Sequence, residues 1–402
     1  MKDSGIEWIG EIPEGWEVVP VKRLCTMQAG KNLTSEQIAP EGTYPVYGGN
    51  GIRGYFSDYN CDGQFLTVGR QGALCGNVHK INGKIWATEH AVITTPSSYT
   101  ILDFLYYLLI GMDLNQYISS TAAQPGLAVG TLLNLKTCYP CSTLEQTQIS
   151  NYLNAKCTEI DTMLYKTRSS IEEYKKLKQA VITQAVAKGV RGEREMKDSG
   201  VDWIGEIPMD WTIQRFARVA EVKSNLVSPD NYLEYPQISP ENIEKDSGKL
   251  LLPCKTVGEV GIISGNHLFH KGQILYSKIR PKLNKVCIAP FDGLCSADMY
   301  PIETNNDTRY IMYCILSDGF LQQVSMITEN RVKMPKINQT ELSKLLLAMP
   351  NFLAEQKEIA DYLDAKCAEI DGLIAKKEQL VKELESYKKS LIYEVVTGKR
   401  EV

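Results

Sequence analysis

The chain has 402 residues, with 44 Lys and Arg against 48 Asp and Glu, and therefore a formal net charge of −4. Its length allows two or three domains, and its 43% hydrophobic and 23% charged residues exclude wholesale disorder. No run of about 20 apolar residues could form a membrane helix, and eleven scattered cysteines favour reduced thiols in a cytoplasmic protein over a disulfide framework. The near-neutral charge also argues against a simple basic DNA-binding protein.

The sequence contains one module twice. Residues 1–16 match residues 196–211 at 12 of 16 positions, and residues 145–161 match residues 355–371 at 11 of 17 positions. A period of about 200 residues is far longer than a solenoid repeat, so it indicates duplication of a whole module. The two copies should then be related by a pseudo-two-fold axis and should use equivalent surfaces. Two paralogous domains whose linkers diverged slowly are the alternative.

The first variable segment, residues 17–144, predicts a β-rich α+β domain. Between residues 44 and 95, short apolar runs alternate with turn signals such as Gly48-Gly49-Asn50-Gly51, which is typical of short strands. A helical stretch is expected near Leu102–Tyr117.

The second variable segment, residues 212–354, differs in sequence but predicts the same class of domain. Residues 250–303 have the texture of short strands, and a helical stretch is expected near Tyr310–Met326. The fold class predicted for the chain is therefore α+β with an internal repeat.

Two long helices are expected outside the variable segments. From Glu145 to about Lys188, and again from Glu355, apolar residues recur at three- and four-residue spacing. The opposite face is charged, and in the first copy it includes Glu172, Glu173, Lys175, Lys176 and Lys178. A narrow apolar seam with charged flanks is typical of a coiled coil, so we expect the two helices to pair antiparallel as a stalk of about 60 Å. A helix folded back on its own domain is the alternative.

The residues expected in this coiled-coil seam are apolar or aromatic and come from both helices. They are Ile160, Leu164, Ile171, Tyr174, Val181, Ile370, Ile374, Val381, Leu384 and Leu391.

Several strings resemble catalytic or metal-binding motifs but lack the neighbouring elements or ligands that such motifs need. Residues 49–54 match G-x-G-x-x-G, but no apolar strand precedes them and no helix follows. Cys138 and Cys141 form a single C-x-x-C without a second pair, which leaves a redox role or half a zinc site as weak alternatives. His267 and His270 lack a third ligand nearby. The sequence has no Walker loop, no Asn/Asp-Pro-Pro-aromatic string and no carboxylate cluster for a nuclease, so we expect no catalytic site and no metal site.

Net charge conceals local basic segments. Residues 63–88 contain no acid, and residues 260–291 contain no acid but five Lys and Arg. Basic patches interleaved with aromatic and amide side chains suit duplex DNA, because Lys and Arg neutralise phosphates while Arg, Asn and Gln read base edges. A solvated face that binds nothing is the alternative for either patch alone.

Several short motifs stand in a fixed order along the chain, and two of them occur in both copies. They are Trp8–Pro13 with Trp16, their copy from Trp203 to Trp211, Tyr44–Gly51, Gly69–Ala73, Gln124–Leu127, Ser277–Pro281 with Lys285-Val286, and the Glu-Gln pairs at 145–146 and 355–356. In this order they resemble the specificity subunit of a type I restriction–modification system, over essentially the whole chain.

The resemblance implies a non-catalytic DNA-recognition subunit. Its two target-recognition domains each read one half of a bipartite, asymmetric DNA sequence, and its helices act as a spacer ruler and a docking site. The implied partners are two methyltransferase subunits, which use S-adenosylmethionine, and possibly two motor–nuclease subunits, which use ATP and Mg; no cofactor is expected in this chain. The expected divisions are recognition domains at 1–144 and 196–354, and helical spacers at 145–195 and 355–402.

The residues expected to contact DNA lie in the basic segments and the loops beside them. They are Arg53, Arg70, Gln71, Lys80 and Gln124 in the first domain, and Lys278, Arg280, Lys282, Lys285, Arg331 and Lys333 in the second. One departure leaves open whether the two domains use matching loops: Met334–Ile337 stands where the first domain has Gln124–Leu127. A nuclease or fused methyltransferase, and a stand-alone DNA-binding or coiled-coil adaptor protein, are the alternative functions.

Overall fold

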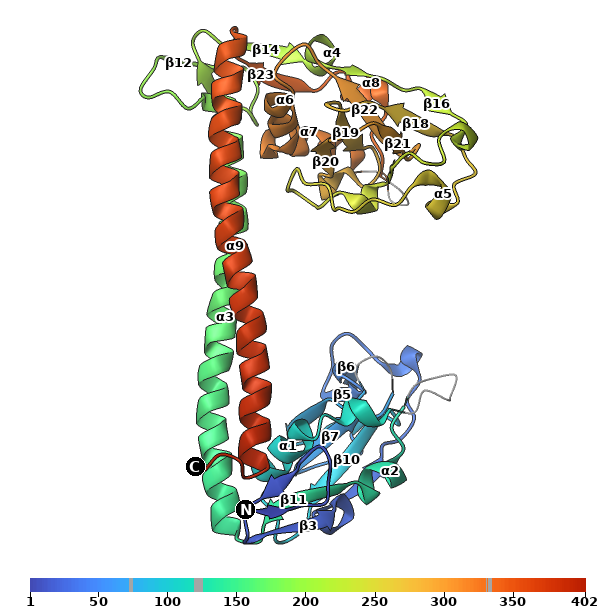
Figure 1. Ribbon diagram of the computed structural model, residues 1–402, viewed down its shortest axis with the longest axis vertical. Helices are drawn as coiled ribbons and strands as arrows, with labels where there is room; N and C mark the ends of the chain where they lie inside the picture. Colours follow the sequence, from blue (N-terminus) through green and yellow to red (C-terminus); the bar gives the residue numbers. More distant parts are fainter. Residues whose placement is uncertain (72–74, 119–125, 330, 332–334) are drawn as a thin grey trace. The chain divides into compact units, whose positions relative to one another are not determined.

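The computed structural model describes residues 1–402 except 72–74, 119–125, 330 and 332–334 (Figure 1). The chain divides into two compact units: unit 1 is residues 1–168 with 379–402, and unit 2 is residues 169–378. Each unit therefore combines one variable segment with parts of both long helices. No helix in the described ranges is long and apolar enough to cross a membrane.

The repeated opening sequence forms the same small hairpin in both units. In unit 1, β1 (Lys2–Asp3) pairs with β2 (Glu11–Ile12), and in unit 2, β12 (Met196–Asp198) pairs with β13 (Glu206–Pro208) in the same register. Glycine is needed in its loop because Gly5 has φ = 65°, in the left-handed region.

Both units contain a four-stranded antiparallel sheet of the same strand order, which we call the frame sheet. The strands of unit 1 lie in the order β4 (Cys25–Ala29), β10 (Ala91–Pro96), β7 (Gln64–Gly69) and β8 (Val78–Asn82). The strands of unit 2 lie in the order β15 (Glu221–Val222), β22 (Met299–Glu303), β19 (Ile274–Ser277) and β20 (Val286–Ile288). The two variable segments therefore share topology although they share no obvious sequence.

A second sheet differs between the units. In unit 1 it is β6 (Gly51–Phe56), β5 (Tyr44–Gly48) and β9 (Trp86–Ala87). In unit 2 it is β16 (Leu226–Val227), β18 (Asn266–Phe269), β21 (Gly293–Cys295) and β17 (Gln237–Ile238). The units thus have a common frame sheet and different additions to it.

The remaining elements join these sheets to the long helices. The paired strands are β3 (Trp16–Pro20) with β11 (Lys136–Pro140), and β14 (Thr212–Arg215) with β23 (Leu346–Met349). The shorter α-helices are α1 (Leu102–Gly111), α2 (Val129–Asn134), α4 (Phe216–Val219), α5 (Val257–Val260), α6 (Thr308–Leu316), α7 (Asp318–Thr328) and α8 (Gln339–Leu342). The 3₁₀ turns are η1 (Val21–Arg23), η2 (Ser35–Gln37), η3 (Leu114–Tyr117), η4 (Pro229–Asn231), η5 (Pro240–Asn242) and η6 (Pro281–Leu283).

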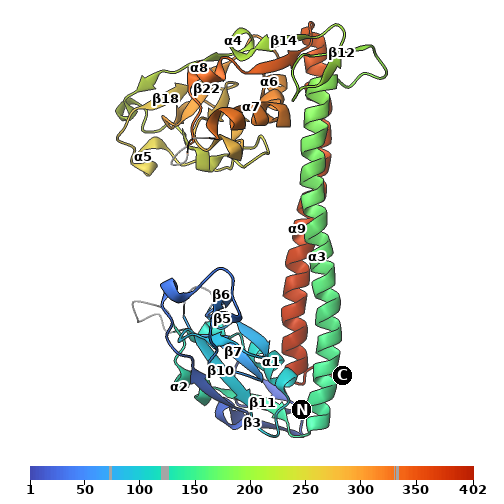
Figure 2. The same ribbon diagram turned by 180° about the vertical axis from the view of Figure 1, so that it is seen from behind.

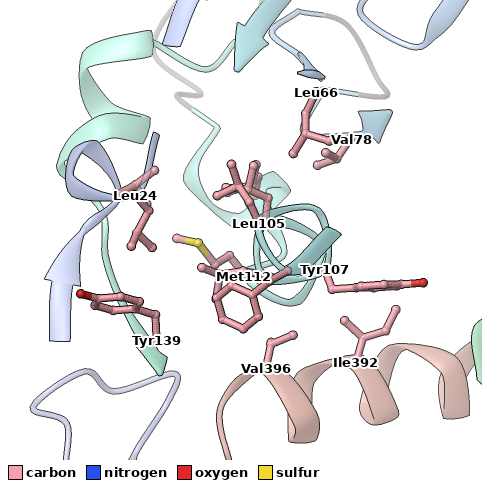
Figure 3. Packing of buried hydrophobic residues seen from close by; sticks show 14 of the residues in the cluster. Leu24, Leu66, Val78, Leu105, Tyr107, Met112, Tyr139, Ile392 and Val396 are labelled. Atoms are coloured by element: carbon pink, nitrogen blue, oxygen red, sulfur yellow. The ribbon is translucent and has the colours of Figure 1, made fainter. Parts of the chain in front are cut away.

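The core of unit 1 lies between the frame sheet, α1 and a long helix. Figure 3 shows Leu105 of α1 and Met112, which directly follows this helix, between sheet residues such as Leu66 and the side chains of Ile392 and Val396. All five are buried. Since each buried aliphatic side chain contributes about 1.5–3 kcal/mol, this layer binds the variable domain to the helix.

The two long helices are α3 (Thr143–Lys188) and α9 (Leu353–Val396). In each unit they lie side by side and antiparallel (Figures 1 and 2), which confirms the predicted helical pairing. Five of the ten seam residues are buried and the other five are half-buried. The buried ones are Ile160, Leu164, Ile171, Ile370 and Leu391.

Lys178 does not lie on the charged face, so that part of the prediction was wrong. It is buried in the seam of unit 2, where its Nζ donates to both carboxylate oxygens of Asp371 at 2.9 and 3.0 Å. Unit 1 has the equivalent pair 210 residues away, in which Lys388 donates to both oxygens of Asp161 at 2.7 Å. In these two ion pairs, each long helix supplies one Asp and one Lys.

The repeated Trp and Glu-Gln residues join each variable domain to its helix. Trp16 Nε1 donates to Glu145 Oε1 at 2.8 Å, and Trp211 Nε1 donates to Glu355 Oε1 at 3.2 Å. The buried amide of Gln146 donates to the carbonyl oxygens of Tyr99 and Pro140, and its oxygen accepts from the N–H of Ile101. In unit 2 the amide of Gln356 donates to the side-chain oxygen of Asn306 and the carbonyl oxygen of Pro350, and its oxygen accepts from the N–H of Asp307. The repeated residues therefore have the same structural role in both units.

Candidate nucleic-acid interface

In unit 1 the end of β7 carries the predicted basic residue Arg70. Its backbone N–H donates to the carbonyl of His90 at 2.9 Å, and its own carbonyl accepts from the N–H of Leu127 at 2.9 Å. The next residue, Gln71, forms an isolated bridge with Gly126. The backbone at this strand end is thereby fixed on both sides, while the side chain of Arg70 is half-buried.

Unit 2 contains the same arrangement at the end of β19. The N–H of Lys278 donates to the carbonyl of Asp298 at 3.0 Å, and its carbonyl accepts from Ile337 at 2.9 Å. The next residue, Ile279, forms an isolated bridge with Lys336. The described parts of the two loops therefore pair with their strand ends in the same way.

The tip of the β5–β6 hairpin lies against the strand end of unit 1. A Cβ on Gly69 would stand 1.9 Å from the carbonyl oxygen of Gly49, and a Cβ on Gly49 would stand 2.7 Å from the carbonyl oxygen of Gln71. Only glycine permits this approach. The exposed Arg53 follows along β6, and its side chain covers Gly48. The hairpin therefore brings the predicted residues Arg53 and Gln71 to one surface.

Two amide side chains at this surface were missed from the sequence. Asn77 Nδ2 donates to Asn50 Oδ1 at 2.6 Å across the hairpin tip. Beneath them lies His79, whose Nε2 is buried without a hydrogen-bond partner among the described residues, and burial lowers the pKa of this imidazole. Asn side chains can read the edge of adenine. The signal was the Gly-Gly-Asn-Gly turn, which predicts a tight turn and is part of the Tyr44–Gly51 motif but does not by itself predict a DNA contact.

The cations of unit 2 lie around the equivalent strand end. Lys278 Nζ is 5.3 Å from the centroid of the Tyr300 ring, and this cation–π contact orients the side chain. Arg280 is exposed, and its backbone at φ = 45° donates to the carbonyl of Pro335 at 2.8 Å. Lys282 is exposed in η6. Burial lowers the pKa of His267, and the nearby positive charge of Lys278 lowers it further.

Three predicted cations have internal partners instead. Lys80 pairs with Asp103 at 2.8 Å and lies over the ring of Tyr106 at 4.5 Å. Lys285 donates to a backbone carbonyl oxygen at 2.6 Å, that of Pro240 in the adjacent loop. The side chain of Arg331 pairs with the carboxylate of Glu341, which raises the pKa of this guanidinium and lowers the pKa of Glu341. Two further predicted residues, Gln124 and Lys333, lie outside the described residues.

The motifs rejected as catalytic have structural places. Residues 49–54 form a hairpin and do not precede a helix. Cys138 is buried while Cys141 is exposed, and His267 is buried while His270 is exposed. In the described part of the chain, no three His, Cys, Asp or Glu side chains are grouped so as to hold a metal ion.

Comparison with known proteins identifies the family. The model of the type I restriction modification DNA specificity domain matches residues 13–173 and 208–383. The chain is 29% identical over 381 residues to the EcoDI specificity subunit of Escherichia coli, covering 90% of this chain and 84% of that protein. It is 45% identical over 121 residues to the EcoprrI specificity subunit of Escherichia coli, covering 29% of this chain and 30% of that protein.

Solved structures show the same fold at low sequence identity. A chain described under complex assembly and conformational transition of the type I R-M system matches with a TM-score of 0.70 and 13% identity, covering 97% of this chain and all of that one. The HsdS subunit from Thermoanaerobacter tengcongensis matches with a TM-score of 0.50 and 14% identity over the whole of both chains. The chain therefore belongs to the type I restriction–modification DNA specificity family, as the DNA-recognition subunit, which is not itself the enzyme.

Proposed function

We propose that the two units read the two halves of a bipartite, asymmetric DNA target. The observation that carries this proposal is the equivalence of the strand ends at Arg70 and Lys278, which place a cation at the same backbone position in both units. The second sheets that flank these strand ends differ, so the half-sites should differ as well. Phosphate contacts set the register, while a few side chains specify bases.

The predicted contact residues divide into two groups under this proposal. Arg53, Arg70, Gln71, Lys278, Arg280 and Lys282 contact DNA directly, together with Gln124 and Lys333 of the loops beside them. Lys80, Lys285 and Arg331 hold the surrounding elements through their internal partners. Asn50 and Asn77 join the first group as candidate base readers.

The long helices are the proposed docking site for two methyltransferase subunits. Equivalent positions 210 residues apart carry exposed or half-buried apolar groups outside the paired seam: Tyr152 and Tyr362, Met163 and Leu373, Leu177 and Tyr387. In unit 1 these residues are Tyr152, Met163 and Tyr387, and in unit 2 they are Tyr362, Leu373 and Leu177. We call each of these two sets the docking face of its unit. Exposed apolar groups in clusters are typical of protein interfaces. Two equivalent faces fit two copies of one partner.

The proposed complex contains DNA and two kinds of partner subunit. The helices at 145–195 and 355–402 would space the recognition domains at 1–144 and 196–354. S-adenosylmethionine would bind the methyltransferase partners, and ATP with Mg would bind motor–nuclease partners where these are present. The complex would act on DNA in the cytoplasm.

The direct test is to map methylated positions in the host chromosome. We expect methylation at two unlike half-sites separated by a constant, unspecified spacer. Deletion of this chain's gene should abolish it, while a chain with residues 212–354 exchanged for those of a relative should change one half-site only. A palindromic target, or methylation that survives the deletion, would contradict the proposal. The adaptor alternative is not favoured, because the family model of the DNA specificity domain matches both copies of the module. It would be supported if the complete complex bound no specific duplex.

A further inference from the structure

Unit 1 has an open groove, and the equivalent place in unit 2 is arranged differently. The groove has a volume of about 610 Å³ and lies beside the start of β8, the end of α1 and one face of α9. The side chains that line it include the apolar Ile110 and Leu114 and the polar Asn77, His79, Asp113 and Lys389. Ser390 lines it as well. None of them belongs to the docking face, although Lys389 and Ser390 follow Tyr387 of that face on the same helix.

The walls of this groove have equivalents in unit 2. The residue two before β8 is Gly76 with φ = 90°, and the residue two before β20 is Asn284 with φ = 44°. Tyr107 Oη donates to Asn154 at 2.9 Å, just as Tyr313 Oη donates to Asp364 at 2.8 Å, so α1 and α6 dock on their helices in the same register.

In unit 2 the equivalent place is filled by the chain's own residues 240–250. Lys285 Nζ donates to the carbonyl of Pro240 at 2.6 Å, which fixes the start of this segment. Gly248 packs at the end of α6, where a Cβ would stand 3.2 Å from Leu316 Cδ1. Lys249 then reaches Asp371 on α9 at 2.7 Å. The segment thus contacts the strand side, the short helix and the long helix in turn.

Two side chains complete the closure in unit 2. Asn284 Nδ2 donates to the carbonyl oxygen of Leu316 at 3.1 Å, and Gln179 Nε2 donates to the same oxygen at 2.6 Å. In unit 1 the equivalent of Asn284 is Gly76, which has no side chain, and the equivalent of Gln179 is Lys389. Unit 1 therefore lacks both side chains that close the site.

The corresponding chain segment of unit 1 runs elsewhere. Between β4 and β5, Lys31 donates its N–H to the carbonyl of Ala87 at 2.9 Å, and Ala39 pairs with Tyr55 through both backbone groups. These residues follow the second sheet of unit 1. The groove beside α9 is consequently left without an internal occupant among the described residues.

The partners of Asp371 indicate which charged group an occupant of the unit 1 groove would carry. Asp371 of unit 2 binds both Lys178 and Lys249, and its side chain is 20% exposed. Its equivalent in unit 1, Asp161, binds Lys388 alone among the described residues and is 55% exposed. A lysine of an incoming segment could form an ion pair with Asp161, as Lys249 does with Asp371, because an exposed carboxylate with one partner can accept a second hydrogen-bond donor.

We propose that this groove receives a turn of the methyltransferase subunit docked on unit 1, with a glycine to pass the end of α1 and a lysine to meet Asp161. The inference rests on the proposed function, because the partner is the one assigned to the docking face, and the groove is continuous with that face through α9. The copy docked on unit 2 finds residues 240–250 already in place. Two copies of one partner therefore bind the two units in different ways.

The first experiment measures whether the groove takes such a segment. A fluorescein-labelled peptide of Ile243–Leu251 is titrated against the full chain, and weak saturable binding is expected, with a Kd of about 0.1–1 mM because the peptide lacks the effective concentration of the tethered segment. Ser390→Trp, which fills the groove from an exposed helical position, should weaken binding at least tenfold. Lys382→Trp, an exposed control on the same helix, should not. Absence of binding, or equal loss in both variants, overturns the proposal.

The second experiment identifies the occupant in the assembled complex. A photo-reactive residue at position 390 should cross-link to the methyltransferase subunit, at a segment that contains Gly beside Lys, and one at position 382 should do so at least tenfold less. Cross-links to a second copy of this chain, or none in an assembled complex, overturn the proposal and leave the proposed function intact. Failure of the methyltransferase subunits to assemble at all contradicts the proposed function, and the peptide titration then decides whether the groove binds such a turn.

Discussion

The ion pairs between α3 and α9 allow a stability experiment with an internal control. Lys178→Met removes the charge from the pair in unit 2 and keeps the aliphatic stem. The Lys178 and Asp371 side chains are 7% and 20% exposed. The equivalent substitution, Lys388→Met, acts on a pair whose side chains are 29% and 55% exposed. The two variants change the same chemistry at equivalent positions and differ in burial.

Burial decides the expected magnitudes. Breaking a buried pair costs about 3–5 kcal/mol because one charge stays behind without a partner, whereas an exposed pair contributes about 0–1 kcal/mol. Asp371 retains Lys249 at 2.7 Å, so we expect the lower end of the range, about 3 kcal/mol, for Lys178→Met. For a unit of this size that lowers Tm by about 6–12 °C. Lys388→Met should lower it by less than about 4 °C.

Differential scanning calorimetry of the full chain, in low and in high salt, checks these values. The transition of unit 2 should move in Lys178→Met, and the transition of unit 1 should move little in Lys388→Met. High salt should reduce the second effect more than the first, because exposed pairs are screened. Equal shifts in both variants would refute the reasoning that burial sets the contribution of each pair.

The remaining predictions concern DNA and pH. Inserting seven residues after Ile171 should change the spacer of the target and leave both half-site sequences unchanged in a methylation map; an unchanged spacer would end the ruler idea. Arg70→Ala should weaken binding of all duplexes alike and reduce the slope of log K against log[salt] by about 1, as measured by fluorescence anisotropy; loss confined to one sequence would contradict a phosphate contact. His79 and His267 have pKa values lowered from 6.5 by burial, so the unfolded chain takes up protons first and stability falls as pH drops below 6.5. His267→Gln should flatten that fall in urea unfolding between pH 7.5 and 5.5, and an identical fall in the variant would argue against this role.

The fold was predictable from sequence where a pattern is local. The apolar spacing from Glu145 to Lys188 predicts α3 because helix periodicity depends on neighbours within a turn or two. The position of Lys178 was not predictable in the same way. Over 46 residues a small error in the phase of the seam accumulates, so a residue assigned to the charged face can lie in the buried one.

The candidate site was only partly predictable because it depends on contacts between distant residues. Lys80 resembled other basic residues in sequence, but its partner Asp103 lies on another element of unit 1. The equivalence of Arg70 and Lys278 was likewise hidden, because their neighbours differ and only backbone pairing relates them. Backbone hydrogen bonds do not depend on side-chain identity, so two loops of unlike sequence can take the same conformation.

The bonds from Trp16 to Glu145 and from Trp211 to Glu355 have a consequence for how such a protein can change. Each bond joins the start of a variable segment to its end, so both ends of that segment are held at a junction made by residues that occur in both copies of the module. A different segment with the same ends could be inserted as a cassette and still meet its helix at the same place. A new DNA sequence preference could therefore arise by a single exchange of coding sequence, with the helical pairing left unaltered.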